Sequence, residues 1–382
     1  MERLRKRNKT SVDHRYHFTI MEKSNVTAKQ ISPSGSPDGA WRMAAIALLA
    51  VRFAQGWIYW GGGTRRFIYG PQKLDPAGHW MAYKFQTAMP GALLGTNHLI
   101  SYLLHHFTLL YIGVIAFSAI EMIAGFMLIA GLMTRLAAVA SIGLSTVLML
   151  MFGWQGATCI DEWTMASANF AMGITLFLAG SSAYSLDNYL LRKNSALGDR
   201  AWFQWLGGSQ PLPLSARGFQ RLGLALFWIS VVWIVGTYSY YRGSVITPFH
   251  GGPVSPAKHH LSLSNAMILK DGSLRFQAYL DAGTPADPSH ILRIELLRSE
   301  DGRIVETWDT RALAELPKKS FQNDYPYQQF SAHRFGIVAG VGAKAMIILP
   351  PIHAAPLAEG PYLLRVTSVN DHVWTAPVKP VQ

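Results

Sequence analysis

The sequence of 382 residues has one cysteine, Cys159, and few charged residues. A single cysteine excludes an intramolecular disulfide, a covalently attached c-type haem and a cysteine-ligated iron–sulfur cluster. Charged residues make up 15% of the chain, whereas they make up about 25% of a typical soluble domain. Apolar residues make up 50%, and twelve Trp, fifteen Tyr and eighteen Phe add many aromatic rings. This composition excludes an ordinary soluble enzyme.

Sequence motifs for bound cofactors are also missing. His259-His260 has no third ligand at a metal-binding spacing, and the other histidines of the C-terminal part are scattered. The run Gly61-Gly62-Gly63 is not followed by the Lys-Ser/Thr that completes a phosphate-binding P-loop. No internal repeat has the period of a solenoid or a propeller. We therefore expect no metal, haem or flavin.

The sequence does contain five apolar segments, each close to the roughly 20 residues that cross a hydrocarbon core. They comprise residues 41–60, 107–132, 135–153, 164–181 and 222–241. Aromatic residues mark the ends of several segments, as in the aromatic belts at membrane–water interfaces. We predict an α-helical membrane bundle of four spans and a fifth span that anchors the remainder of the chain.

The distribution of lysine and arginine predicts the orientation of these spans. Residues 1–41 carry eight of them and 182–221 carry five, whereas 61–106 carries four and 154–163 carries none. Because cytoplasmic loops are enriched in lysine and arginine, we expect the N-terminus in the cytoplasm and the C-terminal segment in the periplasm. This is the topology of a multi-pass protein of the inner (cytoplasmic) membrane.

The net charge of +12 is compatible with nucleic acid, a membrane face or small anions. The basic excess lies in the first 241 residues, mostly in segments that we assign to the cytoplasm, so we expect no nucleic-acid partner. The first 40 residues lack the apolar stretch of a signal peptide. Their Ser, Pro, Gly and charge content indicates a disordered arm, with a DNA-binding arm as the alternative.

The C-terminal segment changes to period-two patterning. Alternating or short apolar stretches such as 274–280 and 291–297 are separated by turn signals such as Asp301-Gly302, which is typical of an antiparallel β-sandwich. The predicted organisation thus has five parts. They are a disordered cytoplasmic arm (1–40), a four-span membrane domain (41–190), a cytoplasmic linker (191–218), a fifth span (219–241) and an extracytoplasmic all-β sandwich (242–382).

Two charged residues lie near the middle of predicted spans. Arg52 is about midway through the first span and Glu121 about midway through the second. An ionisable residue at that depth is costly and is usually paired. Because consecutive spans run antiparallel, we place the two at similar heights and predict a structural Arg52–Glu121 ion pair. Glu121 is also a candidate proton carrier, since intramembrane carboxylates often serve proton transfer.

A basic cluster follows the first span on the predicted outer side. Gly61–Gly63 leads into Arg65 and Arg66, and Lys73 comes soon after. Arginine forks recognise tetrahedral oxyanions, and a glycine run allows backbone N–H groups to approach the same anion. The cluster therefore predicts an anion site formed by these cations, while contact with lipid headgroups is the alternative.

Cys159 lies in the short loop between the third and fourth spans, on the same predicted outer side as the basic cluster. A lone cysteine is commonly an inert packing residue. An unpaired thiol that faces a non-cytoplasmic compartment is less usual and is a candidate reactive group. Both interpretations stay open at this point.

Several motifs together resemble a known family. They are Gln55-Gly56-Trp57 after Arg52, Pro71-Gln72-Lys73-Leu74-Asp75-Pro76, Glu121-Met122-Ile123-Ala124-Gly125, Gly131-Leu132-Met133-Thr134-Arg135 and Tyr184-Ser185-Leu186-Asp187. Residues 41–190 resemble the DoxD membrane subunit of the DoxX-like family, and 219–382 resemble the DoxA subunit. Their succession in one chain is similar to the fused DoxD–DoxA form of thiosulfate:quinone oxidoreductase.

The resemblance implies that two thiosulfates are coupled to tetrathionate while a membrane quinone accepts two electrons and two protons. The expected partners are thiosulfate, quinone and the lipid bilayer, and self-association into a homo-oligomer stays open. The alternative is a non-catalytic membrane adaptor or accessory subunit of a respiratory terminal oxidase. Quinone reduction by the purified chain with thiosulfate as donor distinguishes the two.

For such a reaction, the charge, position and chemistry of individual residues suggest their roles. Arg65, Arg66 and Lys73 are expected to bind thiosulfate, and Cys159 and Glu121 are the catalytic candidates. The residues expected to contact the quinone are Trp57, Tyr59, Trp60, His105 and His106. In this hypothesis the Cys159 thiolate joins the terminal sulfur of one thiosulfate as two electrons pass to quinone. A second thiosulfate then attacks the distal sulfur of that S–S bond, which releases tetrathionate and the thiolate.

Overall fold

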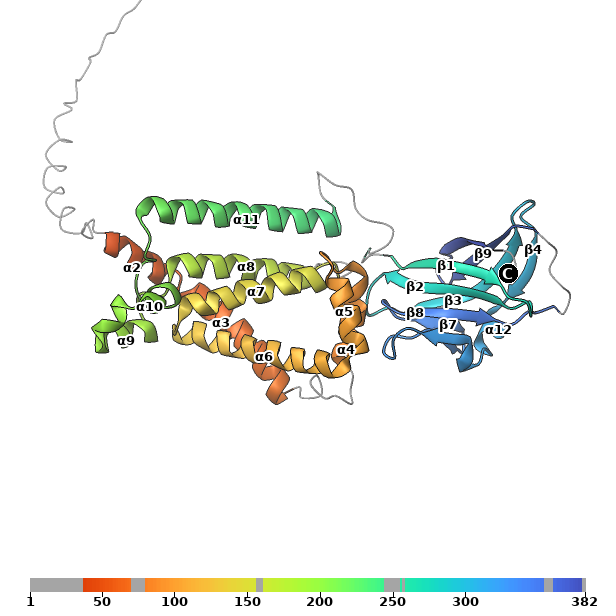
Figure 1. The fold of residues 1–382 in the computed structure, drawn as a ribbon, viewed down its shortest axis with the longest axis horizontal. Coiled ribbons are helices and arrows are strands. Elements are labelled where there is room, and N and C mark those ends of the chain that lie inside the picture. The colour runs from red at the N-terminus through yellow and green to blue at the C-terminus, as the bar shows by residue number, and fades with distance from the viewer. Residues whose placement is uncertain are drawn as a thin grey trace, which may run out of the picture.

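The computed structural model describes residues 37–69, 80–155, 161–243, 255, 258–353 and 360–379. A helical bundle is followed by an all-β domain of two antiparallel sheets, which confirms the predicted fold class (Figure 1). Most of the predicted arm, residues 1–36, lies outside the described residues.

The helices of the N-terminal region are α2 (Pro37–Ala47), α3 (Leu49–Thr64), α4 (Trp80–Ala88), α5 (Thr96–His105), α6 (Phe107–Ala130), α7 (Thr134–Phe152), α8 (Asp161–Ala179), α9 (Leu186–Lys193), α10 (Ala201–Leu206) and α11 (Ala216–Arg242). Helices α6, α7, α8 and α11 run roughly along the long axis of the molecule, and α3 runs obliquely to them (Figure 1). Helices α9 and α10 lie at one end, which we call the cap end. Helices α4 and α5 lie at the other end, against the β domain, which we call the outer end.

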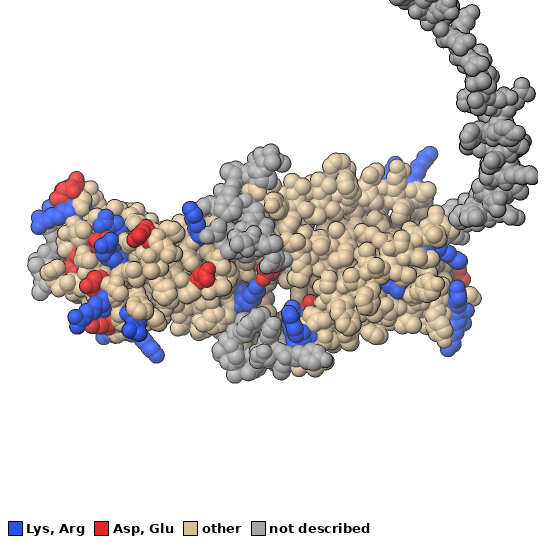
Figure 2. Space-filling view, turned by 180° about the vertical axis from the view of Figure 1, so that it is seen from behind, with Lys and Arg blue, Asp and Glu red and all other residues tan. Residues whose placement is uncertain are grey.

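Within the part of the chain that the structure describes, three helices are long and apolar enough to cross a membrane, namely α6, α7 and α11. Helices α2 and α3, bent by 45° at the break between them, count as a fourth if they form one broken span. Helix α8 packs along α7 but is not among these candidates, because polar residues such as Glu162, Ser167 and Asn169 interrupt it. Figure 2 shows a wide band with few charged residues between the cap end and the β domain. The structure thus has several apolar spans, and their number of five stays a prediction.

The first span does not end at the glycine run, as the sequence suggested. Helix α3 continues through Gly61–Gly63 to Thr64 and then into a turn of π-helix, Arg65–Tyr69. Helix α3 packs closely and antiparallel against α6. The packing is so close that a Cβ on Gly63 would collide with Met122, and one on Gly125 would collide with the backbone of Trp60. The glycines therefore serve close helix packing.

The predicted linker 191–218 is folded rather than extended. After α9, the chain forms a 3-10 helix, Ser195–Asp199, and then α10, so that this segment covers the cap end of the bundle. Ser215 then caps α11 by accepting a hydrogen bond from the backbone N–H of Gly218 at 3.1 Å. Helix α11 contacts the bundle near its last turns, where Tyr241 donates to the carbonyl of Met149 at 2.8 Å.

The β domain consists of two antiparallel sheets around one apolar core. Its strands are β1 (His260–Ile268), β2 (Leu274–Ala282), β3 (Ser289–Arg298), β4 (Ile304–Trp308), β5 (Phe321–Asn323), β6 (Ser331–His333), β7 (Gly336–Ala339), β8 (Lys344–Leu349), β9 (Tyr362–Ser368) and β10 (Val373–Val378). One sheet has the order β1-β2-β8-β5 and the other β10-β9-β3-β7-β6, with β4 beside β3. Alternating burial along β8, for example, follows from the period-two sequence.

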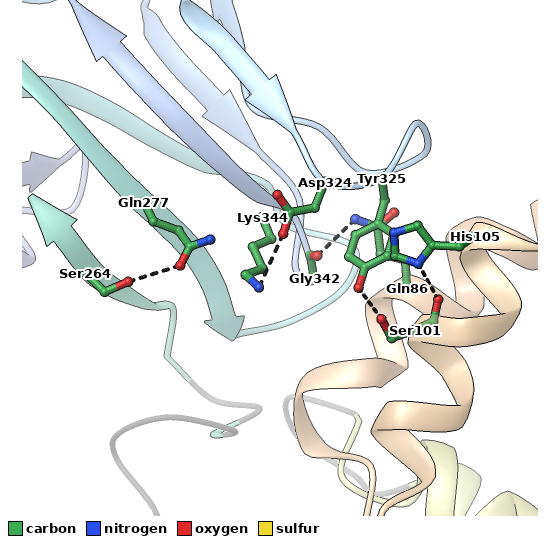
Figure 3. Close-up of polar contacts among 9 residues, drawn as sticks. All are labelled: Gln86, Ser101, His105, Ser264, Gln277, Asp324, Tyr325, Gly342 and Lys344. Carbon is green, nitrogen blue, oxygen red and sulfur yellow. Dashed lines mark hydrogen bonds and ion pairs between the residues drawn. The ribbon is translucent and has the colours of Figure 1, made fainter.

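The β domain is docked on the outer end of the bundle by buried polar contacts (Figure 3). The Gln86 side chain of α4 is fully buried, and its amide donates to the carbonyls of Gln328 at 2.8 Å and Gly342 at 2.9 Å. Its oxygen accepts from the Gln328 N–H at 2.8 Å. The hydroxyls of Ser101 and Tyr325 lie 2.7 Å apart, and the Tyr325 ring contacts His105. Because Gln86 is satisfied on both sides, this contact fixes the position of the β domain on α4.

Candidate functional site

One face of α3 is polar along most of its length. Arg52, Gln55, Tyr59, Gly62 and Arg66 follow one another at intervals of three or four residues, which places them on one side of a helix. The first three are buried in the bundle. We call this set the polar face of α3. It is the feature of the membrane region that departs most from an apolar interior.

Glu121 forms its ion pair with Arg66, and the predicted Arg52–Glu121 pair is wrong. The packing of α3 on α6 explains the difference: Gly62 lies directly against the Glu121 carboxylate, and Gly131, beyond the end of α6, lies against the Arg52 guanidinium. Arg52 and Glu121 are therefore at different heights. The error came from treating residues 41–60 as one straight span: the chain bends by 45° between α2 and α3, and Arg52 is only the fourth residue of α3.

Arg52 instead binds backbone carbonyls at the cap end. Its guanidinium donates to the carbonyl of Tyr184 at 2.7 Å and, more weakly, to that of Ser181 at 3.5 Å. The Asp187 carboxylate lies close enough to attract it. Arg52 therefore holds the segment between α8 and α9 against the first turn of α3.

Two further charged side chains at the cap end each form several hydrogen bonds. Arg135 is fully buried and donates to four carbonyls, those of Phe177, Gln204, Gly207 and Gln210, at 2.7–3.0 Å. The Asp187 carboxylate accepts from the N–H groups of Met133, Thr134 and Gly208 at 2.7–3.3 Å. Burial raises the pKa of the Asp187 carboxyl, and these N–H groups oppose that shift. The motifs around Arg135 and Asp187 thus build one structural network.

A second polar cluster lies between α3, α7 and α8. The Gln55 amide donates to the Ser141 hydroxyl at 2.6 Å and to the Asn169 carbonyl at 2.7 Å. The Tyr59 hydroxyl lies 2.9 Å from the Ser145 hydroxyl and 3.1 Å from that of Ser141. Glu121 lies near enough to Tyr59 to interact electrostatically. The cluster therefore reaches from the interior of the bundle towards the Arg66–Glu121 pair.

The predicted anion site is reshaped by the structure. The backbone N–H groups of Gly61–Gly63 belong to helix α3, so they are not presented to a ligand. Arg66 is engaged by Glu121, whereas Arg65 is exposed and has no ion-pair partner among the described residues. Both arginines lie beside Glu121, the fifteenth of the 24 residues of α6, and not at its outer end. Lys73 lies outside the described residues.

The five residues expected to contact the quinone are not brought together. Tyr59 faces the interior, Trp57 is exposed and stacks on Phe53, and Trp60 contacts Phe126 on the α3–α6 surface. His105 and His106 lie at the junction of α5 and α6, where their rings form hydrogen bonds with the carbonyls of Ser101 and Tyr102. That junction is about four turns of α6 away from Glu121.

Cys159 lies outside the described residues, so its catalytic role stays a prediction. Within the described ranges, no group of three or more His, Cys, Asp or Glu side chains is arranged to hold a metal ion. A cavity of about 340 Å³ lies between Tyr83 of α4 and the β-domain segment around Gln328–Ser331. Its described lining has no charged residue, which makes it a poor site for a dianion.

Sequence reasoning missed Ser141, Ser145, Asn169 and Gln86. The two serines are four residues apart in an otherwise apolar segment, which is the spacing of one helix face. That signal was available but weak, because serine hydroxyls in membrane helices are commonly bonded to their own helix. The role of Gln86 depends on a contact with residues 328 and 342, which no local pattern encodes.

Two protein-family models match the chain. The TQO small subunit DoxD matches residues 47–215, and the TQO small subunit DoxA matches residues 241–377, where TQO is thiosulfate:quinone oxidoreductase. Among solved structures, a Pseudomonas fluorescens alkylpurine DNA glycosylase, AlkC, bound to DNA containing an abasic site analog, aligns at 11% identity over 74% of this chain and 77% of that chain. Its TM-score of 0.18 is too low to argue for a common fold.

Proposed function

Because the chain belongs to the thiosulfate:quinone oxidoreductase small-subunit families, with DoxD and DoxA joined in one polypeptide, we propose that it oxidises two thiosulfates to one tetrathionate. The two electrons reduce a membrane quinone, which also takes up two protons to form quinol. We further propose that the protein lies in the inner membrane with its N-terminus in the cytoplasm and its β domain in the periplasm.

The observation that carries this proposal is the Arg66–Glu121 pair, set in the middle of the apolar helix α6. Ionisable residues at such depth are rare and usually functional. The side chains are 24% and 10% exposed, so the pair is reached from the surface of the bundle. Trp60 and Phe126 supply aromatic surface on the same two helices, with ring centroids 6.1 Å apart.

These residues suit a lipid-soluble quinone. Its ring requires apolar surface, its carbonyl oxygens require hydrogen-bond donors, and its reduction requires protons. Trp60 and Phe126 would cover the ring, the Arg66 guanidinium would donate to a carbonyl oxygen, and the Glu121 carboxyl would pass a proton. Tyr59 would lie behind this site rather than against the ring.

We assign thiosulfate binding to Arg65, which has no ion-pair partner among the described residues, and to Lys73. Arg65 is exposed beside the Arg66–Glu121 pair, and Lys73 follows it closely in the sequence. A dianion gains charge-assisted hydrogen bonds from such an arginine. Cys159 is kept as the covalent carrier of the first thiosulfate, and the Cys159→Ser variant tests that role. Intact mass spectrometry of thiosulfate-treated protein should show an adduct that the variant lacks.

The decisive experiment uses the purified chain in detergent or lipid with a soluble quinone analogue. Thiosulfate should cause reduction of the quinone with one tetrathionate formed per quinol. Arg65→Ala should raise KM for thiosulfate about tenfold, the loss expected for one charge-assisted contact, with kcat little changed. No turnover by the purified chain would favour a non-catalytic adaptor, and an unchanged KM would remove Arg65 from the thiosulfate site.

A further inference from the structure

Several polar atoms inside the bundle have no hydrogen-bond partner among the described residues. Three lie near the middle of the bundle: Gln55 Oε1, Asn169 Oδ1 and Ser118 Oγ. Their residues are 0%, 3% and 1% exposed. An unsatisfied buried polar group costs about 1–3 kcal/mol. Such groups are retained in native interiors mainly where water or a ligand satisfies them.

The same condition continues to the cap end. Four more buried oxygens have no partner within the described ranges, namely the hydroxyls of Ser181, Ser182 and Ser209 and the side-chain carbonyl of Gln210. Ser181 also accepts from Arg52 through its backbone carbonyl. Arg52 is one turn before Gln55 on the polar face of α3. Arg52 therefore lies between the unsatisfied groups near Gln55 and those at the cap end.

The other half of the bundle is different. Towards the outer end, its interior is filled by an apolar cluster that includes Leu110, Val114, Met151 and Phe152. The unpartnered amide of Gln155 at that end adjoins residues 156–160, which lie outside the described ranges. Among the described residues of the bundle, Gln155 apart, the polar groups that could order water thus lie between Glu121 and the cap end.

Hydroxyls and amides lead from Gln55 to Tyr59, which lies near Glu121. Gln55 donates to Ser141, Ser141 contacts Tyr59, and Tyr59 contacts Ser145, all within 3.1 Å. Ser118 is three residues before Glu121 on α6, so the two share a helix face. Waters bound at the unsatisfied oxygens of Gln55 and Ser118 would have to join this cluster to Glu121.

We propose that internal water completes a hydrogen-bonded chain through these groups and delivers protons to Glu121 from the side of the membrane opposite the β domain. This proposal rests on the proposed quinone reduction. Oxidation of two thiosulfates to tetrathionate releases two electrons and no protons, whereas quinone needs two of each to become quinol. Both protons must come from solvent, and the position of the polar interior indicates that they enter from the cap side. Turnover then carries charge across the membrane whenever thiosulfate is oxidised on the β-domain side.

Radiolytic hydroxyl-radical footprinting of the wild-type protein tests the water itself, without any need for activity. Tyr59 and Tyr241 are both almost fully buried, at 3% and 2% exposure. The Tyr241 hydroxyl bonds to a backbone carbonyl at 2.8 Å, whereas Tyr59 lies within the proposed chain. Tyr59 should be oxidised about tenfold faster than Tyr241, because radicals form in water adjacent to it. Equal, slow oxidation of both rings would show a dry interior and overturn the proposal.

Proteoliposomes test the direction of proton uptake. Because thiosulfate added outside reaches only molecules whose thiosulfate site faces outwards, mixed insertion does not confuse the result. An entrapped pH dye should report alkalinisation of the lumen during quinone reduction, with potassium and valinomycin present to dissipate the membrane potential. Alkalinisation of the outer medium alone would overturn the proposal. Absence of quinone reduction would overturn the proposed function and, with it, the role of the water chain in turnover.

Variants then assign the path to residues. Gln55→Leu should slow lumen alkalinisation and kcat together, about tenfold or more, and increase the solvent deuterium isotope effect, with KM for thiosulfate unchanged. Thr146→Val is the matched control, because the Thr146 hydroxyl is already bonded to the carbonyl of Ile142 in its own helix; it should behave as wild type. Tyr59→Phe replaces Gln55→Leu if the latter does not fold. Wild-type proton uptake in a folded variant of either residue would overturn the assigned path.

Discussion

Arg135 and Arg66 are both arginines of the helical bundle, but their surroundings differ. Arg135 is fully buried at the cap end and donates to four backbone carbonyls. Arg66 is partly exposed beside the middle of α6, and the Glu121 carboxylate is its one ion-pair partner among the described residues. Four of the five N–H groups of Arg135 donate to backbone carbonyls, whereas one hydrogen bond among the described residues, to Glu121, engages the Arg66 guanidinium.

This difference separates a structural charge from a functional one. A guanidinium that donates four of its five N–H groups to backbone carbonyls has little left to offer a substrate, and it joins segments that are far apart in the sequence. A guanidinium held by one carboxylate can exchange partners, and the carboxylate can take or release a proton. Both arginines are costly to bury. The cost is offset by the backbone contacts that Arg135 makes and by the function that we propose for Arg66.

The largest effect is expected at Arg135. Arg135→Leu leaves four carbonyls at the cap end without a donor and removes a compensating charge near Asp187. Breaking a buried charge network of this kind costs about 3–5 kcal/mol. We expect the variant to be recovered aggregated or unfolded by size-exclusion chromatography in detergent.

Arg135→Lys sharpens this result, because lysine keeps the charge but cannot reach four acceptors with a planar fork. It should also be strongly destabilised, as measured by thermal unfolding. A lysine variant as stable as wild type would mean that charge alone, and not the geometry of the carbonyls, holds the cap end.

The second effect concerns turnover rather than folding. Glu121→Gln keeps the size of the side chain and one acceptor for Arg66, but the amide cannot take up and release a proton. Loss of a proton-transfer group typically costs a factor of 10²–10⁴, so kcat for quinone reduction should fall about 100-fold while the protein remains folded. Glu162→Gln is the matched control, since Glu162 also pairs with a cation, Lys84, at 2.7 Å. A similar loss in both variants would argue that any broken ion pair impairs the enzyme.

The third effect compares two buried glutamines. Gln86 is fully satisfied at the β domain, whereas Gln55 has an unpartnered oxygen. Gln86→Leu leaves the Gln328 N–H and two carbonyls without partners, at a cost of about 1–3 kcal/mol, and should increase the rate at which protease separates the β domain from the bundle. Gln55→Leu should not change that rate. Equal sensitivity of the two variants would mean that Gln86 does not hold the domain interface.

Much of the fold could be predicted from the sequence because its signals are local. Apolar segments of membrane-spanning length predicted the bundle, and period-two alternation after residue 242 predicted the sandwich. The end of the first span could not be predicted in this way. Three glycines resemble a loop in sequence, but they are helical here because α6 packs against them, a contact between distant segments.

The sequence identified the charged residues of the candidate site but not which of them pair with each other. Arg52, Arg66 and Glu121 were all identified as unusual, yet the partner of Glu121 was wrong because a shift of α3 along α6 exchanges one arginine for the other. The polar cluster of Gln55, Ser141 and Asn169 requires three helices to meet. A single sequence contains no record of which helix faces meet.

The smallest effect is a pH dependence at the cap end. Burial raises the pKa of the Asp187 carboxyl above its ordinary value near 3.8, so the folded protein holds this proton more tightly than the unfolded chain does. Stability contributed by the protonated form is present at low pH and is lost as pH rises from about 3.8 through the folded-state pKa. Asp187→Asn cannot titrate and provides the reference. The free energy of unfolding of wild type, minus that of the variant, should therefore decline modestly over this interval and then level off. A difference that rises with pH would show that the three N–H donors outweigh burial, and that Asp187 is held as a carboxylate as firmly as Arg135 is held as a cation.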